Sequence, residues 1–102
     1  MSADAVSPHA TAPLSPDSRP RLAPGVRLKF DATRQQWMVL APERVLVPDE
    51  TALDVLQRCN GETRFDALID DLAKAYDADR DEIAADVREL LNGLIEKRLL
   101  TI

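Results

Sequence analysis

Alternating hydrophobic and polar residues predict three short strands in the first half of the chain. Over residues 26–30, Val, Leu and Phe alternate with Arg and Lys, which is typical of a half-buried strand. A polar connection at 33–35 and an apolar run at 37–40 then predict its hairpin partner. Residues 44–47 form a very short third stretch, which Pro48 ends because proline has no amide hydrogen for a ladder.

From residue 49 onwards the apolar residues recur at helical spacing. Asp49 is a good N-cap, and apolar residues follow it at positions 52, 53, 55, 56 and 59. The first helix should end at Asn60-Gly61, because Gly61 can adopt the left-handed conformation that closes a helix. Thr63 with Asp66 forms a weaker capping box, which predicts a second helix whose apolar face runs over residues 65–76.

The longest helical pattern lies near the C-terminus. Asp79 with Glu82 is another capping-box pattern, and the helix that it opens should reach about Lys97. Positions 90 with 91 and 94 with 95 are both apolar, so the stripe is wider than a coiled-coil seam and part of it could serve a second contact. Gly93 interrupts the stripe, and close approach of another helix is one explanation for it.

Residues 1–23 have the composition of a Pro/Ala-rich disordered tail or interdomain linker. Five of the seven prolines lie before residue 25, and such a density excludes helix and central strand. We expect order to begin at the turn dipeptide Pro24-Gly25, so that residues 24–102 form one domain. His9 stands alone in the tail, where no second metal ligand accompanies it.

Composition and charge restrict the classes of partner. The chain has 102 residues, of which 45% are hydrophobic and 30% charged, as in an ordinary globular domain. Residues 1–48 carry six Lys and Arg against four Asp and Glu, whereas residues 49–102 carry seven against fourteen. The acidic helical half argues against nucleic acid as a partner. No apolar run approaches the roughly 20 residues of a membrane-spanning helix, so we expect no membrane role.

The sequence contains no recognisable catalytic or metal-binding group. Cys59 has no histidine to activate it, falls on an apolar helix face and is interpreted as a buried structural thiol. A lone cysteine and the absence of a secretory pattern favour the cytoplasm. The carboxylates at positions 77, 79, 81 and 82 lack the glycine and the distant glutamate of an EF-hand. Trp37 is compatible with either a core or an interface role. We therefore expect a binding protein that is not an enzyme and holds no cofactor.

Several segments resemble one family in their order and spacing. They are Arg21-Leu22-Ala23-Pro24-Gly25-Val26-Arg27-Leu28, Val39-Leu40-Ala41-Pro42-Glu43, Leu53, Leu56-Gln57-Arg58-Cys59-Asn60-Gly61, Asp86-Val87 and Leu90-Leu91. From about Pro20 to Leu100, the chain resembles PqqD, the pyrroloquinoline quinone (PQQ) biosynthesis protein D. This resemblance implies an α+β, winged-helix-like domain, with three N-terminal antiparallel strands followed by three helices.

The resemblance also implies a function and partners. Domains of this family are recognition elements for ribosomally made and post-translationally modified peptides (RiPPs). By similarity, the chain would bind the precursor peptide PqqA and present it to PqqE, a radical S-adenosylmethionine (SAM) enzyme that cross-links a glutamate to a tyrosine. The iron–sulfur clusters and SAM would belong to that partner. Family members can be fused to the oxidase PqqC, and the N-terminal tail resembles a linker of such a fusion.

The family's binding groove lies between the third strand and the third helix. A short strand bounded by prolines can offer its unpaired amides and carbonyls to an extended peptide, which would then add to the sheet. The resemblance carries peptide-binding roles to Arg44, Val45, Leu46 and Val47 on the strand and to Ile83, Val87, Arg88 and Leu91 on the helix.

Two other functions are compatible with such a fold. A winged helix can bind DNA, but this would favour a basic third helix, whereas residues 79–98 contain six Asp and Glu against four Lys and Arg. The chain could also be a structural module that dimerises by pairing its free strand edge with a second copy.

Overall fold

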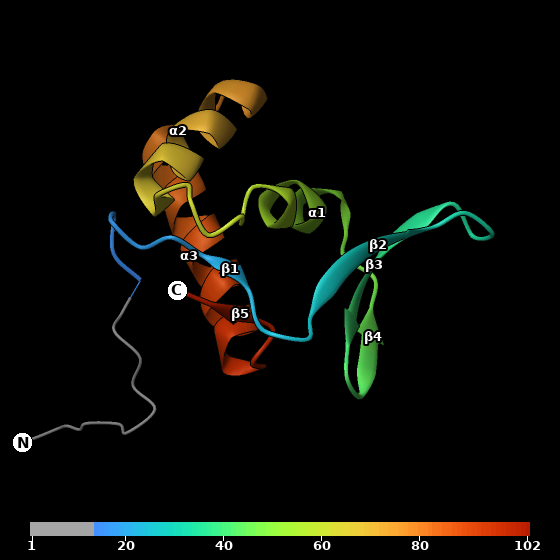
Figure 1. Ribbon diagram of the computed structural model, residues 1–102. Helices are drawn as coiled ribbons and strands as arrows, with labels where there is room; N and C mark the ends of the chain where they lie inside the picture. The colour runs from blue at the N-terminus through green and yellow to red at the C-terminus, as the bar shows by residue number, and fades with distance from the viewer. Residues whose placement is uncertain (1–13) are drawn as a thin grey trace, which may run out of the picture.

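Two small antiparallel sheets and three helices make up residues 14–102, which are the residues that the computed structural model describes (Figure 1). The strands are β1 (Arg21–Leu22), β2 (Arg27–Asp31), β3 (Gln36–Ala41), β4 (Arg44–Leu46) and β5 (Leu100–Thr101). The helices are α1 (Glu50–Gln57), α2 (Phe65–Tyr76) and α3 (Arg80–Glu96). The predicted α+β class, with a three-stranded sheet followed by three helices, is confirmed.

The three-stranded sheet has the order β2-β3-β4 and one apolar face directed at the helices. Leu28 of β2, Val39 of β3 and Leu46 of β4 lie opposite one another in the register. Directly opposed residues of antiparallel strands point to the same side, so these three form one row. Val39 is buried and the other two pack against the core, and this row therefore attaches the sheet to the rest of the fold.

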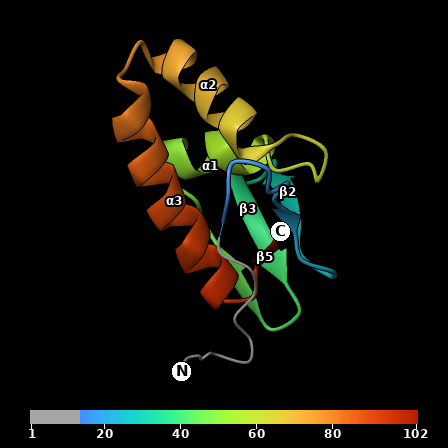
Figure 2. The same ribbon diagram turned by 90° about the vertical axis from the view of Figure 1, so that its left-hand side faces the viewer.

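The helices form the other layer of the molecule. α2 and α3 pack against each other, and α1 crosses between them and the sheet (Figures 1 and 2). Their shared core is almost entirely aliphatic, with the largest fully buried side chains contributed by α2 and α3 and by the residues just after α3. These side chains include Leu68, Ile69, Leu72, Leu91 and Leu99. The long helix α3 is thereby fixed against α2 on one side and faces α1 and the sheet on another.

The helix ends agree only partly with the predicted caps. The Asp49 carboxylate accepts a hydrogen bond of 2.7 Å from the Ala52 amide, which confirms Asp49 as the N-cap of α1. Gly61 has a φ of +79°, the left-handed conformation predicted for it, but it does not close α1, which ends at Gln57 with Arg58 as its C-cap residue. The capping box at Thr63 is wrong, because Arg64 occupies the N-cap position of α2 and makes no side-chain cap hydrogen bond. Asp79 is the N-cap residue of α3, but its side chain also makes no such bond.

Order begins earlier than Pro24, and this corrects the predicted start of the folded region. Backbone carbonyls of the upstream segment cap α2: Phe65 donates its amide to Ser18 at 2.7 Å, and Asp66 donates to Pro16 at 3.1 Å. These bonds satisfy amides that a side-chain cap would otherwise satisfy. Leu14 is only 5% exposed and belongs to the core. Residues 1–13 of the expected tail, including His9, lie outside the described residues.

The second sheet joins two parts of the chain that are far apart in the sequence. Arg21 pairs with Thr101 and Leu22 with Leu100, so that β1 and β5 form a two-stranded antiparallel sheet. The sequence predicts only an apolar tail after α3, since two-residue strands have too few residues to show alternation. The pair fixes the N-terminal segment beside the end of α3 (Figure 2).

Leu14 provides a test of this packed N-terminal segment. Replacing Leu14 with alanine is expected to lower the free energy of unfolding by about 2 kcal/mol, because a buried leucine loses both its transfer energy and its packing. Urea denaturation of the full chain would measure the change. Ser15→Ala, at the exposed neighbouring position, is the matched control. An unchanged stability in Leu14→Ala would mean that the segment is a tail after all.

Candidate functional site

Within the described part of the chain, the outer edge of β4 is one of the two unpaired edges of the three-stranded sheet, the other being that of β2. β4 pairs only with β3, so within residues 14–102 no strand covers its other edge. Val45 and Val47 are 56% and 58% exposed, whereas Leu46 packs toward the core. Edge strands present unpaired amides and carbonyls to which another extended chain can add. The edge faces the end of α3, because the Arg44 guanidinium donates a hydrogen bond to the Lys97 carbonyl.

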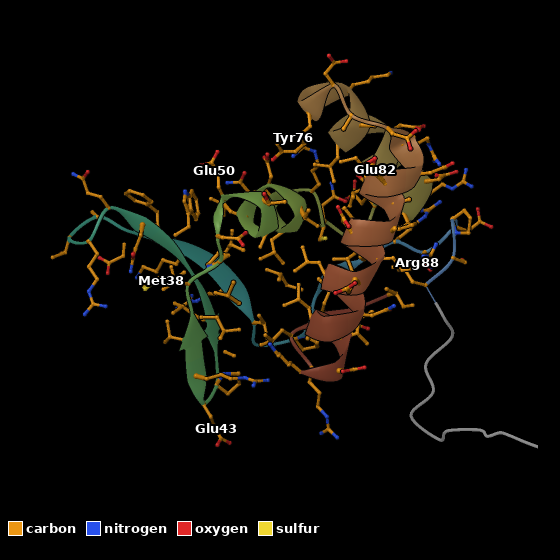
Figure 3. All side chains as sticks on the ribbon, turned by 180° about the vertical axis from the view of Figure 1, so that it is seen from behind. Met38, Glu43, Glu50, Tyr76, Glu82 and Arg88 are labelled. Carbon is orange, nitrogen blue, oxygen red and sulfur yellow. The ribbon has the colours of Figure 1, made fainter. Side chains whose placement is uncertain are left out.

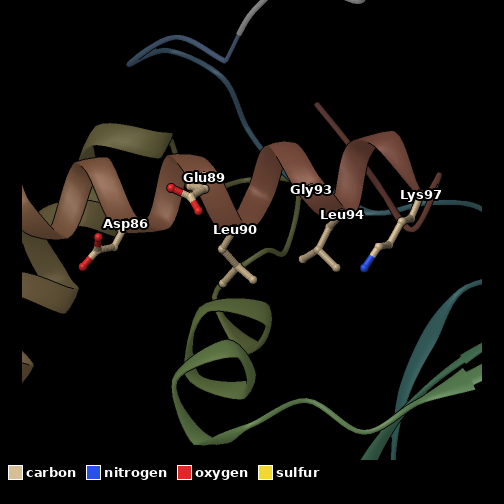
Figure 4. A pocket seen from close by; sticks show the side chains of 6 residues that line it. All are labelled: Asp86, Glu89, Leu90, Gly93, Leu94 and Lys97. Carbon is tan, nitrogen blue, oxygen red and sulfur yellow. The ribbon is translucent and has the colours of Figure 1, made fainter.

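One face of α3 opens toward α1 and the sheet. Asp86, Leu90, Leu94 and Lys97 recur at intervals of four, four and three residues, which places them on the same side of the helix. Together with Gly93 and Glu89 they line a hollow of about 360 Å³ (Figure 4). In this view Leu90 points toward α1, and Leu94 and Lys97 point to the side on which the sheet lies.

The hollow continues along α3 toward its N-terminal end. A second hollow of about 180 Å³ lies between α1 and α3 and shares Asp86 and Leu90 with the first. A third, of about 260 Å³, lies where α1, α2 and α3 meet, and it shares Asp86 with both and is bounded by Ile83 and Tyr76. The three hollows are therefore neighbours along one face of α3, from Ile83 to Lys97, and together we call them the α3 groove.

The first of these hollows has an apolar middle and charged ends. Leu90 and Leu94 are half-buried and form its centre, with the Asp86 carboxylate toward one end and the Lys97 ammonium at the other. Gly93 leaves room beside them: a β-carbon at this position would have no neighbour within 4 Å. Close helix approach, offered above as the reason for Gly93, is therefore wrong.

The predicted site residues divide into three groups. Arg44, Val45, Leu46 and Val47 lie together on or directly after β4, as expected. Ile83 and Val87 line the upper groove, although Val87 is also buried in the core. Leu91 is 0% exposed and belongs to the core, and Arg88 lies on another side of α3. The Arg88 guanidinium is 4.9 Å from the centre of the Phe65 ring and donates to the Leu14 carbonyl.

Four residues that line the groove were not among the predicted site residues. These are Asp86, Leu90, Leu94 and Lys97. Successive residues of an α-helix are rotated by about 100° around its axis. The predicted Val87 and Leu91 each follow a groove residue, Asp86 and Leu90, by one position, and they therefore point toward the core. The adjacent apolar pairs at 90–91 and 94–95 did indicate a second contact face. Leu90 and Leu94 are the members of these pairs that line the groove.

A hydrogen bond closes the upper end of the groove. The Tyr76 hydroxyl at the end of α2 donates to the Asp54 carboxylate on α1, and Arg58 donates to the same group at 3.0 Å. The hydrogen bond from Tyr76, assisted by Arg58, lowers the pKa of Asp54 below its ordinary value. This contact fixes α1 against α2, so the wall of the groove is held in place.

Cys59 is buried and does not contribute to the groove. Its thiol donates a hydrogen bond to the Val55 carbonyl at 3.3 Å, and burial raises its pKa to about 12. Since the thiolate is the reactive form, Ellman's reagent at mildly alkaline pH should label the folded chain more than about tenfold more slowly than the denatured chain. Equal rates would contradict the buried position.

The potential metal ligands of residues 14–102 are scattered along the fold. Within this range, no group of three or more His, Cys, Asp and Glu side chains is placed to hold a metal ion. In the same part of the chain, no helix combines the length and apolarity needed to span a bilayer.

Comparison with known proteins agrees with this fold. The family model described as Coenzyme PQQ synthesis protein D (PqqD) matches residues 36–100. The chain belongs to the PqqD family. A "PqqA binding protein" of Rhodopseudomonas palustris strain TIE-1 is 53% identical over 88 residues, which cover 86% of both chains. One from Xanthomonas oryzae pv. oryzae strain KACC10331 is 51% identical over 84 residues, covering 82% of this chain and 91% of the relative.

Two solved PqqD structures resemble the fold. The solution structure of the PqqD truncation of Methylobacterium extorquens PqqCD has a TM-score of 0.73 and 39% identity, covering 87% of this chain and 95% of that one. It is described as a functional, stand-alone RiPP recognition element. PqqD from Xanthomonas campestris has a TM-score of 0.55 and 48% identity, covering 86% and 98%. The family named by the sequence resemblance is thus confirmed.

Proposed function

We propose that this chain binds the precursor peptide PqqA in PQQ biosynthesis, without catalysing a reaction itself, and presents the peptide to the radical SAM enzyme PqqE. Relatives that are about half identical bear the name PqqA binding protein. The observation that carries the proposal is the free edge of β4 next to the α3 groove. An extended peptide would add to this edge as a fourth strand, and main-chain hydrogen bonds would supply affinity.

Side chains of the added strand would alternate between the two faces of the sheet. Those on the inner face would enter the α3 groove, where Leu90 and Leu94 offer apolar contact. Asp86 favours a cationic or hydrogen-bond-donating group toward one end, and Lys97 favours a carboxylate at the other. The peptide residues that bind here would therefore be apolar in the middle, with opposite charges toward the two ends.

An NMR titration of the labelled full chain with PqqA peptide tests this proposal. Amide shift changes are expected to concentrate on residues 44–47 and on the α3 face that carries Ile83, Asp86, Leu90 and Leu94. Shift changes confined to the exposed face of α2, or none at all, would overturn it. Light scattering without peptide would show a rising mass if the β4 edge instead paired with a second copy, and this would also count against the proposal.

A further inference from the structure

The outer face of the three-stranded sheet carries an apolar strip over β3 and β4, although this face points away from the core. Arg27, Leu40 and Val45 lie opposite one another in the register, as do Lys29 and Met38. These rows alternate with the row that attaches the sheet to the core, so they point to its other face. Met38 lies on the sheet that projects beyond α1, well apart from α3, which carries Glu82 and Arg88 (Figure 3).

The outer sheet patch comprises Met38, Leu40, Val45 and Val47 with the cations Arg27 and Lys29. Its four apolar residues are half-buried or exposed and lie outside the core cluster. Antiparallel sheets commonly place polar residues on the face opposite the core, so an apolar strip on the outer face indicates a contact surface.

The charges on this face are available to a partner. Arg27 and Lys29 are exposed, and neither has an ion-pair partner among residues 14–102. Asp31, the next residue of β2 on the same face, is already engaged by the turn: it lies 3.9 Å from the Arg34 guanidinium and accepts a 3.0 Å hydrogen bond from the Thr33 amide. The patch is therefore an apolar surface with two free positive charges along one side.

We propose that the outer sheet patch docks the modifying enzyme, through an apolar surface of that enzyme bordered by carboxylates. This inference rests on the proposed function. A peptide added to β4 would place every second side chain on this outer face, beside Val45 and Val47. An enzyme docked here would contact the chain and its bound peptide at once, which explains how a protein without catalytic groups can present a substrate.

The charges on the patch favour the modifying enzyme over a second copy of the chain as its binding partner. A second copy of the chain would offer these cations no free carboxylate from its own patch, because Asp31 on the same face is engaged by Arg34 and by the Thr33 amide. A carboxylate-bordered surface would pair with these cations, and its association would be faster at low ionic strength.

The test compares charge reversals on and off the patch. Arg27→Glu with Lys29→Glu removes the cations, and Met38→Glu places a charge in the apolar centre on the central strand, away from the β4 edge. Arg19→Glu with Lys74→Glu is the control, since it makes the same charge change at exposed positions outside the patch. PqqE of the same organism and PqqA peptide are the probes, and binding to each is measured separately by calorimetry or interferometry.

Both patch variants are expected to bind PqqE at least about tenfold more weakly, to bind PqqA within about twofold of wild type, and to lose part of the salt dependence of PqqE binding. The control should keep both affinities. Unchanged PqqE binding in the patch variants, with folding confirmed by thermal denaturation, would overturn the docking site. A concentration-dependent dimer that the patch variants abolish would show that the patch binds a second copy of the chain and not the enzyme. Failure of the wild-type chain to bind PqqA would instead refute the proposed function, so the two failures are distinguishable.

Discussion

A Val45→Pro variant is expected to keep its fold and to bind PqqA about tenfold or more weakly than the wild-type chain. Ala41 and Arg44 flank a two-residue turn and are paired in the register, so we expect them to form a hydrogen-bonded pair. Val45, opposite Leu40, is then the intervening residue, and its amide points away from β3 toward the free edge. Proline would remove that amide without breaking the internal ladder.

The expected loss of affinity in Val45→Pro follows from the carbonyl of the bound peptide that loses its hydrogen-bond donor. A peptide carbonyl left unpaired at the edge costs about 1–3 kcal/mol, and about 1.4 kcal/mol corresponds to a tenfold change in the dissociation constant. Val45→Ala is the matched control, since it shortens the same side chain but keeps the amide. Fluorescence anisotropy with labelled PqqA would measure both variants. Equal affinities for Val45→Pro and Val45→Ala would exclude strand addition at this position.

Local patterns in the sequence predicted the three-stranded sheet and the extents of α2 and α3 well, whereas α1 ends at Gln57, before the predicted Asn60-Gly61. Alternation over residues 26–30 identified the inward row that contains Leu28, and Asp49 identified the start of α1. These features depend on residues near one another in the chain, so sequence spacing records them directly. The resemblance to the PqqD family then directed attention to the short strand at 44–47.

Features that depend on distant segments were not predictable in the same way. The amides at the start of α2 are capped by the carbonyls of Pro16 and Ser18, and backbone groups leave no mark in the side-chain sequence. The β1–β5 pair joins residues about eighty positions apart with two residues on each side. Prolines in residues 14–20 suggested a tail, yet Pro20 is among the fully buried side chains. Proline excludes helix but does not exclude packing.

The candidate site was predictable only in part, since Leu94 and Lys97 of the α3 groove lie beyond the last predicted position, Leu91. The edge strand was located by its length and by Pro48, whereas the α3 face required knowledge of which member of each apolar pair meets the core. Leu91 faces α2 and the core, and Leu90 faces the groove. Both are leucines with apolar neighbours, so only the tertiary arrangement separates them.

This difference between neighbours gives the prediction with the largest effect on stability. Leu91→Ala is expected to lower the free energy of unfolding by about 2–5 kcal/mol, because its side chain is fully buried and its removal leaves a cavity. Native domains are stable by only about 5–15 kcal/mol, so the variant should unfold at a clearly lower urea concentration. Where it remains folded, its affinity for PqqA should change little.

Leu90→Ala is expected to show the converse behaviour. Leu90 is only half-buried and lines the groove, so its truncation should cost less stability than that of Leu91 but weaken PqqA binding severalfold through lost apolar contact. Urea denaturation and a peptide titration on both variants would separate the two roles. The core role of Leu91 predicts a loss of stability, and the groove role of Leu90 predicts a loss of PqqA affinity. The assignment would fail if Leu91→Ala were as stable as wild type, or if Leu90→Ala bound PqqA with unchanged affinity.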